Sequence, residues 1–90
     1  MTNEQIEKFL GADMKGSSLV RISFKTRNSI VGIFIRTPDF NELKSKNFWR
    51  IVSEKNFEQW EKSKDFNLVR MFNGAEFTKL AIAWSVILVA

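Results

Sequence analysis

The sequence predicts a mainly β protein, a small five-stranded bent barrel with an N-terminal α-helix and a short helix in the connection before the fourth strand. The chain has 90 residues, of which 44% are hydrophobic and 13% aromatic, and this composition suits one packed core. Several short segments alternate apolar and polar residues, as half-buried strands do. Five strands of about five residues cannot bury two flat faces in so short a chain, whereas a barrel encloses one core and removes most edges. We expect one domain over residues 1–90, with the helix at 2–11 and the barrel at 18–90.

The N-terminal helix is predicted by the residues of its first turns. Thr2 is a favourable N-cap, and Gln5, three residues later, completes a capping box. Three apolar residues then share one face of the helix: Ile6, Phe9 and Leu10. Gly11 is expected to end the helix. A helix of this length is too short to be stable alone, so its apolar face must dock on the barrel.

The first two strands follow the helix. Val20, Ile22 and Phe24 alternate with polar residues, which predicts a strand with one buried face. The second run, residues 30–35, is apolar on both faces and should therefore be covered on both sides. Gly32 lies in the middle of this run and predicts a bend or a bulge, because a strand interior otherwise loses packing there.

Residues 48–52 and 68–72 predict the third and fourth strands, because they are rich in aromatic and β-branched side chains. Between them, Asn56 has the features of an N-cap. Phe57 and Trp60 lie one turn apart, which predicts a short helix in this connection.

The pair Asn73-Gly74 is the strongest turn signal in the chain and predicts a type I′ hairpin, in which both central residues have positive φ. A fifth strand is expected from about Glu76 toward the C-terminus. The segment from Leu80 to Ala90 is apolar and uncharged. It is shorter than the ~20 residues that a membrane-spanning helix needs, so we expect a buried or interfacial last strand, with membrane association through this segment as the less favoured alternative.

This order of elements resembles the Sm-like family, including its bacterial Hfq branch, in which an N-terminal helix precedes a five-stranded bent barrel. The spacing of the first Sm motif is matched by Val20, Ile22, Phe24, Ile30 and Gly32. The spacing of the second motif is matched by Gly74, Phe77 and Leu80. Other small bent barrels, including SH3-like ones, fit the same patterns.

The resemblance implies a barrel that self-assembles and binds single-stranded RNA. In that family two loops meet and hold a base at the inner rim of a ring. The residues at the corresponding places here are Asp39, Phe40, Asn41 and Asn73. The alternative is that Asn73-Gly74 is only a hairpin turn and that Asp39, which follows Pro38, is only a loop residue.

A basic hairpin is the second candidate for nucleic-acid contact. The chain between Met14 and Pro38 carries basic residues and no acidic one. Arg21 and Lys25 are expected on the exposed face of the first strand, with Arg27 at the adjoining turn. Such a cluster neutralises backbone phosphates and releases counterions. The alternative is a solvated strand face whose charges discourage pairing between edges.

Most of the aromatic residues are expected in the core, because a barrel this small needs large side chains to exclude water. Trp60 lies among charged residues on an amphipathic turn and is the best candidate for an exposed stacking contact. Trp49 is followed by Arg50, which leaves open a mixed site for stacking and charge.

Catalysis is not expected. The chain has no cysteine and no histidine, so the usual zinc site, disulfide, thiol nucleophile and imidazole base are excluded. Carboxylates in the second half alternate with lysines, and Glu58 with Lys62 has the spacing of a surface ion pair. No pair of carboxylates is arranged for hydrolysis. We therefore expect neither an enzyme nor a bound metal or cofactor.

Two functions remain after these exclusions. The formal charge of +4, the basic hairpin and the aromatic residues favour a module that binds single-stranded RNA. The apolar C-terminal strand favours instead a protein-interaction or assembly module, with a homo-oligomer formed through that strand. The acidic, polar N-terminus lacks the features of a secretory signal, so a cytoplasmic location is expected.

Overall fold

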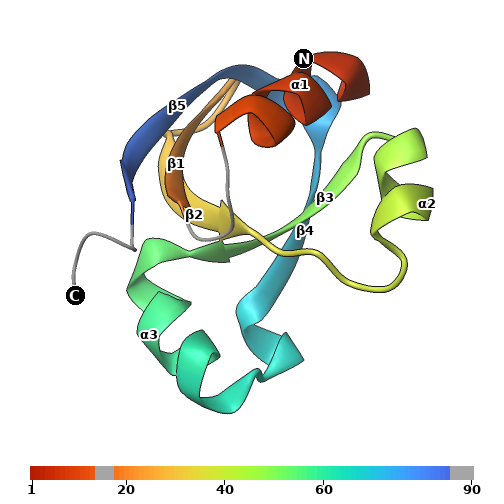
Figure 1. Cartoon of the computed structure of the whole chain (residues 1–90). Coiled ribbons are helices and arrows are strands. Elements are labelled where there is room, and N and C mark those ends of the chain that lie inside the picture. Colours follow the sequence, from red (N-terminus) through yellow and green to blue (C-terminus); the bar gives the residue numbers. More distant parts are fainter. Residues whose placement is uncertain (14–17, 86–90) are drawn as a thin grey trace.

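A five-stranded antiparallel sheet organises this small mixed α/β domain (Figure 1). The computed structural model describes residues 1–13 and 18–85. The helices are α1 (Asn3–Asp13), α2 (Phe40–Ser45) and α3 (Glu54–Ser63), and the 3-10 turns are η1 (Phe66–Leu68) and η2 (Gly74–Glu76). The strands are β1 (Ser18–Phe24), β2 (Ile30–Phe34), β3 (Phe48–Ser53), β4 (Val69–Asn73) and β5 (Phe77–Ser85).

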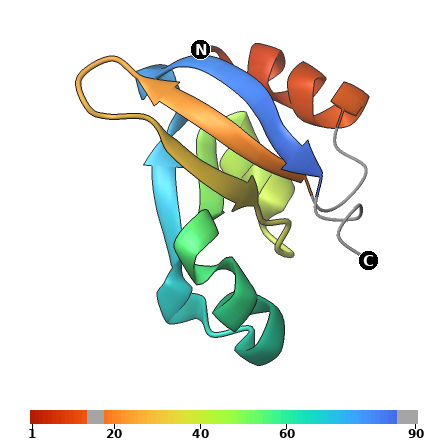
Figure 2. The ribbon, with the colours of Figure 1, turned by 90° about the vertical axis from the view of Figure 1, so that its left-hand side faces the viewer.

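The sheet is bent but not closed. Its strand order is β4-β3-β2-β1-β5, so β4 and β5 form the two edges, and no ladder joins them within the described residues. The predicted closure into a barrel is therefore wrong. The 3-10 turn η2 separates the two strands, and Figure 2 shows β5 leaving the end of β4 obliquely instead of folding back along it. β5 pairs with β1 instead.

The inner face of the bent sheet encloses the main core. Its buried residues are Ile6, Leu10, Val20, Ile22, Phe34, Trp49, Ile51, Phe77 and Leu80. The first two come from α1, which lies across one end of the sheet (Figure 1). Burial of each such side chain contributes roughly 1.5–3 kcal/mol, so tertiary packing holds this short helix in place.

The first turn of α1 forms the capping box that the sequence predicts. The Gln5 amide donates to Thr2 Oγ1 at 3.2 Å, and the Thr2 amide donates to Gln5 Oε1 at 2.9 Å. The predicted end at Gly11 is wrong, because the helix continues to Asp13. A glycine inside a helix costs about 1 kcal/mol, and the docking of the buried Leu10 offsets this cost.

The outer face of the sheet is covered by α3. Trp60 is only 8% exposed and packs with Leu19, Ile33 and Val52, so the prediction of an exposed contact at Trp60 is wrong. The charged neighbours of Trp60 occupy the solvent face of the helix and leave its apolar stripe for the sheet. The prediction that β2 is covered on both sides is confirmed, since Phe34 packs inward and Ile33 outward.

The start of α3 also differs from the prediction. Its N-cap is Ser53, and Asn56 lies inside the first turn, with its Nδ2 donating to Ser53 Oγ at 3.3 Å. Asn56 is therefore not the N-cap. The predicted surface pair is confirmed, with Lys62 Nζ 3.6 Å from Glu58 Oε1.

Gly32 allows a close approach between β2 and β3. A Cβ atom at this position would lie 2.7 Å from the Val52 carbonyl oxygen and 2.8 Å from Ile51 Cγ2. The ladder with β1 covers residues 30–32 and the ladder with β3 covers residues 32–34, so both end at Gly32, and neither shows the register shift of a bulge. The glycine is required because the backbone of β3 leaves no room for a side chain.

The predicted type I′ hairpin at Asn73-Gly74 is wrong. Asn73 has an extended backbone, with φ −87° and ψ 117°, and its Oδ1 accepts a hydrogen bond from the Ala75 amide at 2.9 Å. The side chain of Asn73 therefore caps the 3-10 turn η2. An Asn-Gly pair serves either turn, and local sequence does not distinguish them.

Gly74 is instead required for space at a junction with Asn47. The Gly74 amide donates to the Asn47 carbonyl at 2.8 Å, and a Cβ atom on Gly74 would lie 2.2 Å from Asn47 Oδ1 and 2.6 Å from Ile6 Cδ1. Asn47 adopts φ 63°, accepts from Trp49 Nε1 at 2.8 Å and donates from Nδ2 to the Met1 carbonyl at 3.0 Å. One asparagine thus joins the N-terminus, β3 and the β4–β5 turn.

The apolar end of the chain is only partly buried. Leu80 is 8% exposed, whereas Ile82 on the same strand is 41% exposed. Residues 86–90, at the end of the predicted last strand, lie outside the described residues. Among the residues that the structure does describe, no helix is both long and apolar enough to cross a membrane.

Substitution of Gly74 by alanine is expected to lower the free energy of unfolding by about 1–3 kcal/mol, because the methyl group would overlap Asn47 and Ile6. Urea denaturation followed by tryptophan fluorescence measures this change. Gly11→Ala is the matched control, since no atom lies within 4 Å of its Cβ position, and it is expected to stabilise the helix by up to about 1 kcal/mol. Equal effects of the two substitutions would contradict the role of the junction.

Candidate nucleic-acid interface

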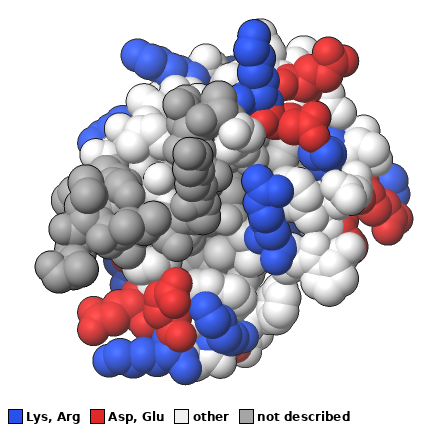
Figure 3. Space-filling view, in the orientation of Figure 1, with Lys and Arg blue, Asp and Glu red and all other residues white. Residues whose placement is uncertain are grey.

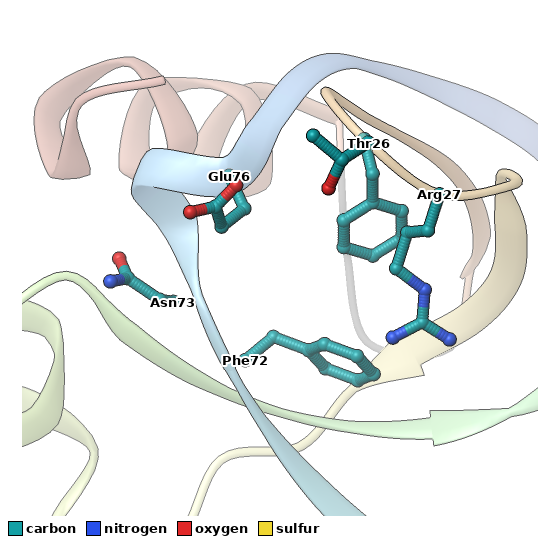
Figure 4. Close-up of a pocket in the computed structure, with 6 residues that line it drawn as sticks. Thr26, Arg27, Phe72, Asn73 and Glu76 are labelled. Atoms are coloured by element: carbon teal, nitrogen blue, oxygen red, sulfur yellow. The ribbon is translucent and has the colours of Figure 1, made fainter.

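The turn between β1 and β2 folds over the edge of the inner core. The ring of Phe24 packs against Phe72 of β4 at 5.6 Å and against Phe77 at 5.4 Å, measured between centroids. Arg27 Cζ lies 5.0 Å from the centroid of Phe24 and 5.7 Å from that of Phe72. Figure 4 shows the Arg27 guanidinium turned toward the ring of Phe72. A planar cation therefore lies beside two aromatic rings in the gap between β1 and β4.

These side chains form a pocket of about 220 Å³, which we call the aromatic pocket. Its lining residues are Phe24, Thr26, Arg27, Phe72, Asn73 and Glu76. Figure 4 shows how two turns of the chain contribute the polar rim: Thr26 and Arg27 from one, Asn73 and Glu76 from the other. The two turns are tied together by the Lys25 amide, which donates to the Glu76 carbonyl at 3.0 Å. The pocket offers apolar ring surface with a hydroxyl, an amide and a carboxylate at its edge.

A second cavity of about 240 Å³ adjoins the first, and we call it the basic hollow. Its lining residues are Arg27, Ile30, Ile51, Ser53, Lys55, Asn56, Arg70 and Phe72. Three of these side chains are cationic, and no acidic side chain of the described residues lines the hollow. Arg27 and Phe72 line both cavities, so the two lie next to each other, and we refer to them together as the groove.

The cations of the basic hollow take part in no ion pair found among the described residues, and the same holds for Lys8, Arg21, Lys25, Arg36 and Lys79. In the view of Figure 3, Lys and Arg lie interspersed with Asp and Glu. Ion pairs in the described residues join Lys44 to Glu7, Lys46 to Glu42, Arg50 to Asp39, Lys62 to Glu58 and Lys64 to Glu61. None of these pairs involves Arg27, Lys55 or Arg70. Arg27, Lys55 and Arg70 therefore gather positive charge in the basic hollow, whereas the adjoining aromatic pocket has the Glu76 carboxylate at its rim.

The predicted basic hairpin is divided between two faces. Arg21 is exposed on the outer face of β1, opposite Val31 and Ala81 in the two flanking ladders. Lys25 is also exposed and lies in the turn directly after β1. Arg27 instead turns back onto the inner rings. The structure brings Arg27 together with Asn73 in the lining of the aromatic pocket, which includes neither Arg21 nor Lys25.

The other predicted residues lie at α2. Phe40 begins this helix and packs against Trp49, with ring centroids 5.9 Å apart, and Asn41 is exposed beside it. Asp39 precedes the helix and bonds to Arg50. None of the contacts found for these three predicted residues reaches Asn73, and none of the three lines the groove. The expected meeting of the two loops does not occur in the described chain.

Asp39 holds the connection between β2 and β3. The Thr37 hydroxyl donates to its Oδ1, and Arg50 Nη1 donates to the same oxygen at 2.9 Å. The hydrogen bond from Thr37, with the charge of Arg50, lowers the pKa of the Asp39 carboxyl below its ordinary value of 3.8. This geometry gives Asp39 a structural role.

Trp49 and Arg50 do not form a mixed site. They point to opposite faces of β3, since Trp49 is 1% exposed in the inner core and Arg50 reaches Asp39.

Phe66 is the most exposed large apolar residue of the described chain, at 56%. The Arg50 Cζ atom lies 5.9 Å from the centroid of its ring.

Sequence reasoning missed most of the basic hollow. Lys55 reads as one charge on a solvated helix, and Arg70 reads as an exposed position in a strand. The ladder places Arg70 opposite the buried Ile51, so its side chain lies on the inner face of the sheet. Residues 69–72 alternate between the two faces of the sheet, so Arg70 and Phe72 share one face. The sequence does not show which face this is until the register with β3 is known.

Comparisons with protein-family models, with curated proteins and with solved structures find no match for this chain. The site is therefore interpreted from its own geometry.

Replacement of Asp39 by asparagine is expected to weaken the dependence of the protein's thermal stability on pH at acidic pH. Because the pKa of Asp39 is lowered in the folded chain, its ionised form stabilises the fold above the ordinary value of 3.8, and this contribution disappears as the pH falls through the folded pKa. Thermal melts between about pH 6 and pH 2.5 would show a lower Tm for Asp39→Asn at the upper end and convergence with the wild type at the lower end. Glu4→Gln, which removes an exposed carboxylate of α1, is the control. Parallel profiles for Asp39→Asn and the wild type would refute this role.

Proposed function

We propose that the chain is a non-catalytic, cytoplasmic binding module whose ligand is single-stranded RNA, bound in the groove formed by the aromatic pocket and the basic hollow. The observation that carries the proposal is the position of Arg27, which lies beside two aromatic rings and lines both cavities. Single-stranded nucleic acid presents unstacked bases next to phosphates. A groove that joins ring surface to cations matches both.

The aromatic part of the groove suits an unpaired base. Phe72 is only half-buried, so part of its ring is open to a ligand while the rest packs on the core. A guanidinium plane adds a second stacking surface, and the polar rim offers donors and acceptors to a base edge. Stacking on such rings contributes about 1–3 kcal/mol per base.

An Sm-like fold is part of the same proposal. The chain supports it with an N-terminal helix, five antiparallel strands in a bent sheet and the motif spacing of Gly32 and Gly74. Within the described residues, β4 and β5 leave their outer edges unpaired. Pairing of β5 in one chain with β4 in the next would use both edges and yield a closed assembly.

A second candidate function is a protein-interaction or assembly module without an RNA ligand. Three large apolar side chains favour it, because they are strongly exposed at the edges of the fold: Phe66 at 56%, Met71 at 49% and Ile82 at 41%. Met71 and Ile82 lie on the two edge strands β4 and β5. Assembly and RNA binding are compatible functions, since the resemblance to the Sm-like family implies both.

Arg27→Ala is expected to weaken the binding of short oligo-uridine or oligo-adenosine by about tenfold or more, because the variant loses both a stacking surface and a phosphate partner. Fluorescence anisotropy at about 50 and 200 mM salt measures affinity and its salt dependence. Arg21→Ala is the matched control: it removes the same charge from the outer face and should change the affinity little. Circular dichroism melts confirm that both variants are folded.

Two results would count against RNA binding in the groove. Absence of binding by the wild type at low salt would remove RNA as the ligand. A loss at Arg21→Ala as large as that at Arg27→Ala would place the contact on the outer face instead of in the groove.

Ile82→Lys tests assembly through the C-terminal strand. If Ile82 lies in an interface, the buried charge should disrupt it and reduce the mass in solution to that of one 10.5 kDa chain. Light scattering at matched concentrations measures the mass. Thr78→Lys, at an exposed position of the same strand, is the control and should leave the mass unchanged. An unchanged mass for Ile82→Lys would exclude this interface.

A further inference from the structure

We propose that the basic hollow is a phosphate-binding subsite that holds one backbone phosphate of the bound strand between Arg27, Lys55 and Arg70. This inference rests on the proposed function and assigns a separate task to Arg27 together with Lys55 and Arg70, two residues that the sequence does not single out. The aromatic pocket would take the base, and the basic hollow would take the phosphate beside it.

The three cations reach the hollow from three separate elements. Arg27 comes from the β1–β2 turn, Lys55 from the first turn of α3 and Arg70 from the edge strand β4. Arg70 faces inward because it pairs with the buried Ile51 in the β3–β4 ladder. Ile30 and Ile51 supply the apolar part of the wall. Tertiary folding, and not local sequence, therefore gathers the charges around one space.

No acidic side chain of the described residues offsets this charge inside the hollow. Arg27, Lys55 and Arg70 take part in none of the ion pairs found among the described side chains. Glu54 is the nearest acid along the chain, and it lines a neighbouring cavity that shares Ile30, Ser53 and Lys55 with the hollow. Like charges that share a concave surface repel each other, and a bound anion relieves that repulsion.

The donors of the hollow suit a tetrahedral oxyanion. Guanidinium groups donate in a planar fork, and the lysine ammonium donates as a compact point charge. Ser53 Oγ accepts from Asn56 Nδ2 at 3.3 Å, which leaves the hydroxyl proton of Ser53 free to donate within the described chain. Ser53 makes no side-chain cap on the α3 amides, so its hydroxyl is not engaged there.

The shared walls of the two cavities couple the base to the phosphate. Arg27 and Phe72 line both cavities, so a base stacked on Phe72 has its own backbone next to the hollow. The outer face of the sheet carries Arg21 and Lys79, and neither residue lines a cavity found among the described residues. The subsite is therefore expected to bind phosphate through local contacts, beyond the general attraction of a positive surface.

The test compares two double variants of equal charge. The variant Lys55→Ala/Arg70→Ala removes two cationic side chains from the hollow, and the control Lys8→Ala/Lys79→Ala removes two exposed cations elsewhere. Each double variant lowers the formal charge of +4 by two. Anisotropy with labelled oligo-uridine should show a loss of about tenfold or more for the hollow variant, with a salt slope reduced by about 0.7, the value of one phosphate on a single strand. The control variant should retain most of the affinity. All four positions are exposed, so circular dichroism melts should show that both proteins remain folded.

Two further probes separate the possible failures. An oligo-uridine with uncharged methylphosphonate linkages should bind the wild type and the hollow variant equally, because it has no charge for the hollow to hold. Equal affinity of the hollow and control variants for ordinary oligo-uridine would overturn the subsite and leave RNA binding intact. Binding of inorganic pyrophosphate but of no oligonucleotide, with the pyrophosphate lost in the hollow variant, would support the phosphate subsite and overturn the nucleic-acid ligand. Binding of neither probe would overturn both.

Discussion

The junction between Asn47 and Gly74 is the constraint on which the rest of this structure depends. It joins the start of β3 to the β4–β5 turn through a 2.8 Å backbone hydrogen bond, with no room for a side chain on Gly74. Because η2 then directs β5 toward β1, the sheet bends around its core without closing. The gap left between the β1–β2 turn and β4 is filled by the rings of Phe24 and Phe72 with Arg27 beside them. The same constraint that prevents a closed barrel therefore creates the candidate site.

Much of the fold is readable from the sequence because local patterns determine it. The capping box of Thr2 and Gln5 forms, the five strands appear in the predicted order, and β2 is apolar on both faces because both are covered. The errors arise where one residue type serves two physical purposes. In the sequence, the glycines at positions 32 and 74 suggest a bulge and a turn that need backbone freedom. In the structure, they are needed because a side chain there would overlap neighbouring atoms. Trp60 reads as exposed among its charged neighbours, but one buried stripe is enough to dock α3.

The candidate site is less predictable because it depends on tertiary register. Of the residues selected from the sequence, Arg27 and Asn73 line the aromatic pocket, whereas Asp39 and Phe40 stabilise the packing of α2. The cations of the basic hollow are far apart in sequence, and only the pairing of β3 with β4 and the docking of α3 bring them together. For locating the candidate site, a run of like charges in the sequence is therefore less informative here than a cavity whose lining has cations and no acidic residue.

An amide chemical-shift map of the ¹⁵N-labelled protein, titrated with short oligo-uridine, tests the central claim most directly, because it locates the ligand without any substitution. Our account places the largest shifts along the groove, in residues 26–28, 53–56 and 70–76, from the β1–β2 turn, the start of α3 and the β4–β5 connection. Shifts confined to Asp39, Phe40 and Asn41, or to the outer face around Arg21 and Lys79, would contradict it and show that the groove is not the binding surface.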